Sequence, residues 1–141
     1  MKLLTASLAL LVTPSIALGT DICSKVAYHP EVPAGLEGTY EVVGRDPVAG
    51  TAYSGTLAIS AGKSGYGVAR VINGKVTTGT AWIEKCGQDN IQSLSVSYSA
   101  STPILAICML ARDGDNYHRV TCRTRTGAMS WRGLESWFQT P

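Results

Sequence analysis

Charge of either sign is scarce in this sequence, and so is histidine. Only 16% of its 141 residues are charged, with 12 basic side chains against 10 acidic ones, and the two histidines are His29 and His118. A charge this low and this balanced excludes an acidic tail, a basic nucleic-acid-binding arm and a disordered chain. The 45% of hydrophobic residues is enough for one core. We therefore expect a single small domain with no nucleic-acid partner.

Motifs for metal binding and for catalysis are missing as well. The four cysteines form no C-x-x-C pair and have no zinc-like spacing to the histidines, so we expect no metal and no cofactor. The sequence has no G-x-S-x-G motif, and the spacing of Glu41, Glu84 and Glu135 selects no carboxylate pair for sugar hydrolysis. We interpret His118 as a solvated histidine at the start of a strand. On these grounds we expect no enzymatic activity.

The first 19 residues have the features of a secretory signal peptide. Lys2 supplies a positive start, an apolar run extends from Leu3 to Val12, and Pro14 and small residues follow. The run is too short for a membrane helix, which needs roughly 20 apolar residues. No second long apolar run follows in the sequence. We expect a soluble periplasmic or secreted protein with no stable membrane insertion.

Four cysteines in an exported protein predict two disulfides. Residues 104–111 and 117–125 have the pattern of two strands, joined by a dense turn signal at 112–116. Pairing about that turn places Cys108 opposite Cys122, within cross-strand reach. Cys23 then ties the N-terminal segment to Cys86. The other pairings of four cysteines stay open at this point.

Alternation of apolar and polar residues runs through the chain after residue 37 and predicts β-strands. Residues 53–60 show it most clearly, and Asn73-Gly74 is a strong hairpin signal. About eight short strands follow one another with turns at regular spacing and no convincing helix between them. A meander of eight strands tends to close on itself, because closure removes exposed edges. The prediction is an all-β, small antiparallel up-and-down β-barrel over residues 37–141, after an irregular segment at 20–36.

Several of these stretches carry a family resemblance. GTYEVVG at 38–44, YSGTLAI at 53–59 and LSVSY at 94–98 resemble small exported bacterial β-barrel proteins of mostly unassigned function. The resemblance spans about residues 37–98. It implies an architecture similar to lipocalin-like and avidin-like barrels and to periplasmic barrel-shaped inhibitors of proteases and lysozyme. The chain lacks the Gly-x-Trp entry motif of lipocalins, so no binding residue carries over from that family.

Arg70 is the first candidate binding residue. It shares a strand face with Tyr66, and alternation alone leaves open whether that face lines the barrel. If it does, the buried guanidinium needs a carboxylate or a ligand anion as its partner. The hypothesis is an interior ligand pocket that Arg70 shares with Tyr40, Tyr53 and Tyr66.

A second group lies in the arginine-rich last third of the chain. Arg119, Arg123 and Arg125 share one face of a strand and form an outward stripe if Cys122 points inward. Such a stripe is either a surface for an anionic partner or a solvated strand face. The large aromatic residues are interpreted mostly as packing in the core or at the barrel mouth; they are Trp82, Trp131, Trp137 and Phe138.

Two functions from different classes remain. The first is a barrel that binds a small hydrophobic or anionic ligand, which an empty interior of a few hundred Å³ favours. The alternative is an inhibitor or interaction module acting on an exported protease or lysozyme-like hydrolase. It would use the loops 45–50, 87–90 and 112–116, and a packed interior with a rigid, protruding loop favours it.

Overall fold

The computed structural model describes residues 23–112 and 117–141, which form nine β-strands and no helix. The predicted signal peptide, and most of the turn expected at 112–116, lie outside these residues. None of the described residues belongs to a helix of the length and apolarity that a membrane crossing needs. The strands are β1 (Cys23–Lys25), β2 (Gly38–Arg45), β3 (Ala52–Ala61), β4 (Tyr66–Ile72), β5 (Lys75–Cys86), β6 (Ile91–Tyr98), β7 (Ile104–Arg112), β8 (His118–Thr126) and β9 (Gly133–Gln139).

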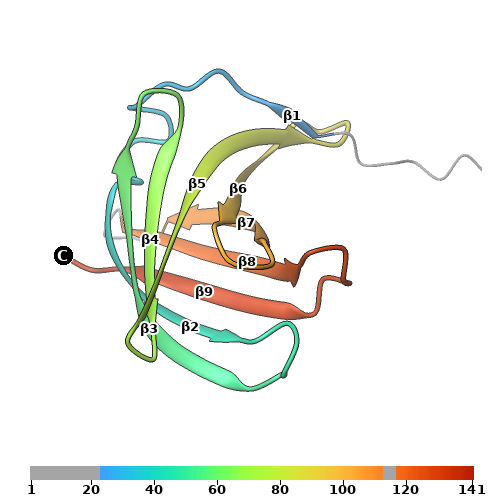
Figure 1. Ribbon diagram of the computed structural model, residues 1–141. Helices are drawn as coiled ribbons and strands as arrows, with labels where there is room; N and C mark the ends of the chain where they lie inside the picture. Colours follow the sequence, from blue (N-terminus) through green and yellow to red (C-terminus); the bar gives the residue numbers. More distant parts are fainter. Residues whose placement is uncertain (1–22, 113–116) are drawn as a thin grey trace, which may run out of the picture.

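Strands β2 to β9 form a closed antiparallel barrel (Figure 1). Each strand pairs with the next along the chain, and β2 also pairs with β9, from Tyr40↔Gln139 to Arg45↔Leu134. Closure leaves neither β2 nor β9 with an unpaired edge. The predicted eight-stranded up-and-down barrel is confirmed. At the β4–β5 hairpin, Asn73 and Gly74 have φ values of 50° and 75°, the positive values that a tight two-residue turn requires.

One strand lies within the segment predicted to be irregular. β5 continues past Ala81, which pairs with Tyr66 at the start of β4, and β1 pairs with this continuation, with Cys23 opposite Cys86. A disulfide joins these two residues, and a second one joins Cys108 to Cys122 across β7 and β8. The hairpin geometry predicted the Cys108–Cys122 bond, and Cys23–Cys86 is the pair that then remained. Two disulfides suit an oxidising, extracellular setting.

The N-terminal segment, residues 26–37, crosses one end of the barrel (Figure 1, blue). The amide of Val26 donates to the carbonyl of Ile83 on β5, and the ring of Tyr28 packs edge-on against Tyr66 of β4 at 5.2 Å. Leu36 is only 1% exposed. We call this the closed end. The turns β2–β3, β4–β5, β6–β7 and β8–β9 gather at the opposite end, the mouth.

His118 is buried at the closed end, so the interpretation of it as a solvated histidine is wrong. Its Nε2 lies 2.9 Å from the carbonyl oxygen of Ala34 in the N-terminal segment. The reason is the alternation of β8, which points His118 inward together with Val120 and Cys122. The alternation can be read from the sequence, but the sequence does not show that the N-terminal segment covers His118.

The core consists of the inward residues of all eight barrel strands, among them Leu57, Val68 and Val96. Of the four large aromatic residues singled out in the sequence, Trp137 lies in the core. Trp131 is partly exposed in the β8–β9 turn at the mouth, one of the two places expected for these residues. Trp82 and Phe138 are partly exposed on the outer face, which corrects the expectation for these two. Trp82 lies outside because it shares the outward face of β5 with threonines.

Candidate functional site

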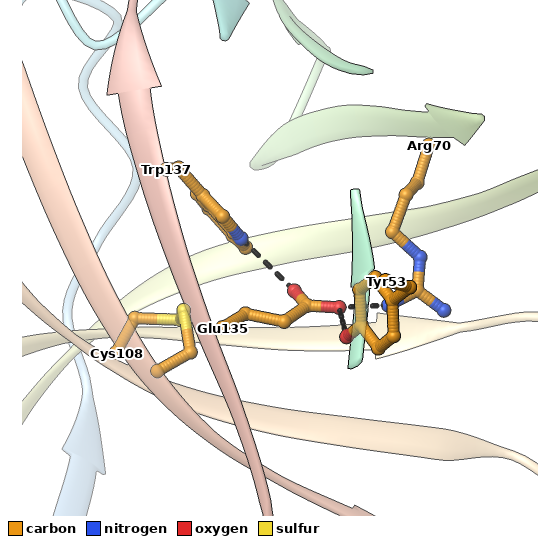
Figure 2. The surroundings of a disulfide bond; sticks show 6 residues. Tyr53, Arg70, Cys108, Glu135 and Trp137 are labelled. Carbon is orange, nitrogen blue, oxygen red and sulfur yellow. Dashed lines mark hydrogen bonds and ion pairs between the residues drawn. A yellow bond between two sulfur atoms is a disulfide. The ribbon is translucent and has the colours of Figure 1, made fainter. Parts of the chain in front are cut away.

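A buried carboxylate lies inside the barrel, toward the mouth. Glu135 is 1% exposed, and three side chains donate hydrogen bonds to it (Figure 2). Trp137 Nε1 donates to Oε2 at 2.9 Å, and the Tyr53 hydroxyl donates to Oε1 at 2.5 Å. Arg70 Nη1 forms an ion pair with the same Oε1. The four residues come from β3, β4 and β9, and the contacts reach across the interior.

Alternation in each strand places these side chains inside. On β9, Gly133, Glu135 and Trp137 share the inward face, and Arg70 is inward on β4. The ring of Tyr53 has room inside the barrel because its partner on β2 is a glycine: a Cβ at Gly44 would lie 2.5 Å from the tyrosine ring. Gly44 therefore supplies the space that lets the phenol reach Glu135.

The charges in this cluster balance each other. Burial alone would lower the pKa of Arg70, but Glu135, Tyr98 and Tyr53 together outweigh it and raise that pKa, so the guanidinium stays protonated. It also lies over the ring of Tyr98, 4.2 Å from the ring centre. Because one positive and one negative group share the site, the cluster is neutral overall. The sequence required a carboxylate or an anion beside an inward Arg70, and the carboxylate is present.

Four of the six tyrosines are expected to resist alkaline titration. Burial raises the pKa of Tyr40, Tyr53, Tyr66 and Tyr98, and Glu135 adds to the effect at Tyr53 and Tyr98. In the unfolded chain they lose their protons near pH ~10. The contribution of these four protonated hydroxyls to the free energy of unfolding is therefore fully present below that pH and decreases as the pH rises above it.

Tyrosinate absorbance measured against pH tests this expectation. The signal of these four residues should appear in one step together with the loss of near-ultraviolet circular dichroism. A gradual rise of all six near pH ~10, with the native dichroism retained, would contradict it.

Next to the buried pair is a cavity of about 440 Å³ that opens at the mouth. Its apolar wall includes Pro47, Ile72 and Ile104, and Arg70 and Thr124 contribute polar groups. The remaining lining residues are Asp46, Tyr53, Asn73, Lys75, Thr77 and Ala100. A volume of this size lies in the range of small-molecule sites, roughly 300–1,000 Å³.

Three buried polar atoms near the cavity have no hydrogen-bond partner within the described part of the chain. They are Arg70 Nε, Thr124 Oγ1 and the hydroxyl of Tyr98. The Thr124 hydroxyl lies against its neighbour on β9, where Gly133 leaves room for it: a Cβ at Gly133 would lie 1.9 Å from Oγ1. Buried polar atoms are usually paired, so an unpaired group that lines a cavity is a candidate for contact with a ligand.

The structure separates the four residues predicted to share a pocket. Arg70 and Tyr53 lie together at the mouth cavity. Tyr40 and Tyr66 lie toward the closed end, where their hydroxyls donate to the carbonyls of Leu36 and Val32. These two tyrosines hold the N-terminal segment in place and do not line the mouth cavity.

Sequence reasoning missed Glu135, Thr124 and Tyr98 as site residues. Glu135 was considered only as one of several carboxylates. The alternation around it, with Trp137 two residues later on the same face, is the signal that identifies it as inward. Thr124 carries the same signal relative to Cys122. Tyr98 belongs to the apolar face of β6 with Val96.

The three arginines of β8 lie on the outer face of the barrel, and each contacts Phe138 or Trp131. Arg119 lies over the ring of Phe138 at 5.5 Å, and Arg125 lies over that of Trp131 at 4.7 Å. Arg123 Nη2 donates to the backbone carbonyl of Trp131 at 3.1 Å. They form the predicted outward stripe, although Arg125 is only partly exposed.

One group of side chains in the described ranges has the composition of a metal site: Cys23, Glu84 and Cys86. Its two sulfurs are bonded to each other, so they are not available as thiolate ligands.

Comparisons of the chain with protein-family models, curated proteins and solved structures found no match. The function is therefore inferred from the geometry of the barrel.

Proposed function

We propose that this protein is an exported barrel that binds a small ligand in the mouth cavity and has no catalytic activity. The observation that carries the proposal is the cavity of about 440 Å³ whose wall contains a buried arginine and a buried threonine with unused hydrogen-bonding atoms. A site made only for stability would satisfy these atoms internally. The closed end, by contrast, is covered by the N-terminal segment, so the mouth is the entrance.

Export is part of the proposal. The signal-peptide pattern of the first 19 residues and the two disulfides both support a periplasmic or secreted protein. Neither feature distinguishes the periplasm from the outside medium. Ligand binding in an exported barrel requires no cofactor and no nucleic acid.

The test uses N-phenyl-1-naphthylamine, an uncharged probe whose fluorescence rises in apolar sites. We expect the wild type to enhance its fluorescence and Ala100→Trp to abolish the effect, because an indole at the mouth fills the entrance. Ala58→Trp is the matched control, since Ala58 is exposed and faces outward on β3. No enhancement by the wild type, or the same loss in both variants, would refute binding at the mouth.

The alternative, a module that binds an exported hydrolase, has one observation in its favour. The β2–β3 loop is held rigid: Asp46 Oδ1 accepts hydrogen bonds from the amides of Val48 and Ala49, and Arg45 Nε donates to the carbonyl of Gly50 at 2.7 Å. Val48 at its tip is 64% exposed. Rigid loops bind with a smaller loss of conformational entropy. The cavity favours the ligand-binding function over this one.

A further inference from the structure

The mouth cavity, if it binds a ligand as proposed, also discriminates between ligands by charge. We infer that it takes an uncharged molecule with a carbonyl-type oxygen, such as an amide, ketone or ester, attached to an apolar body. The inference rests on the proposed function and narrows it. It replaces the earlier alternative of a hydrophobic or anionic ligand with one chemical class.

The acceptors of the buried cluster are already in use. Glu135 Oε1 accepts from Arg70 and Tyr53, and Oε2 accepts from Trp137. Three atoms remain: Arg70 Nε, which only donates, and the hydroxyls of Tyr98 and Thr124, which donate or accept. Arg70 and Thr124 line the cavity, and they are 7% and 1% exposed. A ligand completes these hydrogen bonds only if it brings an acceptor.

The charge of Arg70 is already compensated, which argues against an anion. Glu135 is fully buried beside Arg70, so the pair is neutral before any ligand arrives. A carboxylate or phosphate would bring a desolvated negative charge without a free positive partner in the interior. The other charged residues that line the cavity are one base, Lys75, and one acid, Asp46, so they add no net positive charge. A carbonyl oxygen accepts the same hydrogen bonds without this cost.

The opposite wall of the cavity is apolar, so we expect the rest of the ligand to be apolar as well. Pro47, Ile72 and Ile104 offer no polar side-chain group, and Ala100 adds a methyl group at the entrance. An alkyl or aromatic body that packs against this wall is removed from contact with water, which favours binding. The cavity thus combines a polar floor of donors with an apolar wall, which is the usual composition of small-molecule sites.

The test compares two ligands of the same length, octanamide and octanoate, at neutral pH. Binding to the disulfide-bonded protein is followed by NMR through the indole N–H of Trp137, which reports on the Glu135 carboxylate. We expect octanamide to bind at least about tenfold more tightly than octanoate. Equal or tighter binding of octanoate overturns the inference and leaves the proposed function intact. No response to either compound at millimolar concentrations, together with no probe fluorescence, overturns both.

A variant of Thr124 tests the same inference independently of the charge comparison. Thr124→Val keeps the shape of the side chain and removes its hydroxyl. We expect it to weaken octanamide binding by about threefold to tenfold, the worth of one hydrogen bond. Thr121→Val, on the outer face of β8, is the matched control and should bind like the wild type. Unchanged octanamide affinity in Thr124→Val contradicts the assigned role of this hydroxyl.

Discussion

Glu135→Gln is expected to destabilise the barrel by about 3–5 kcal/mol, because it leaves the guanidinium of Arg70 buried without a negative partner. Arg70 forms its ion pair with Glu135 in the interior, and both side chains are withdrawn from water. The glutamine oxygen still accepts from Trp137 or Tyr53, so most of the loss comes from the uncompensated charge. Denaturant unfolding with the disulfides intact measures it.

A second variant separates charge from packing. In Arg70→Met/Glu135→Gln no buried charge remains, and we expect it to recover most of the stability lost in the single variant. Glu41→Gln, on the exposed face of β2, is the matched control and should stay within about 0.5 kcal/mol of the wild type. A double variant no more stable than Glu135→Gln would show that the charge is not the cause.

Replacing Cys23 and Cys86 with serine is expected to cost about 4 kcal/mol. This disulfide spans 63 residues, and cross-linking a longer loop removes more conformational entropy from the unfolded chain. The Cys108–Cys122 bond spans only 14 residues, for which the same relation gives about 3 kcal/mol. Loss of the longer cross-link also releases β1, so the hydrogen bond from Val26 to Ile83 should weaken.

Denaturant unfolding and hydrogen exchange at the Val26 amide measure the two effects. Ser24→Ala is the control, because Ser24 lies exposed in β1 between the same neighbours. We expect wild-type stability and protection in that variant. A serine variant within about 1 kcal/mol of the wild type, with Val26 still protected, would mean that β1 is held by its strand pairing alone.

The barrel itself was predictable because the information for it is local. Alternation fixes each strand, and turn residues such as Asn73 and Gly74 fix each hairpin. Once eight consecutive antiparallel strands are established, closure follows from the cost of leaving β2 and β9 as edges. The disulfide between Cys108 and Cys122 follows from the register of one hairpin.

The candidate site was only half predictable because its contacts cross the interior. β4 and β9 are not neighbours in the sheet, so no strand pairing places Arg70 beside Glu135. Alternation shows that two residues share a face, but it does not show which inward groups meet at the same height in the barrel. Tyr40 and Tyr66 illustrate the point, since both are inward yet lie near the closed end and not at the mouth.

The location of the two disulfides gives them different chemical lifetimes. Thiol–disulfide exchange requires a thiolate to reach a sulfur atom. Cys23 lies in exposed β1, whereas Cys108 and Cys122 are both 0% exposed within the barrel. A reductant therefore attacks the first bond in the native protein but reaches the second only after β7 and β8 separate. The inner disulfide is shielded by the strands it joins, so its persistence under reducing conditions is set by how seldom the barrel opens.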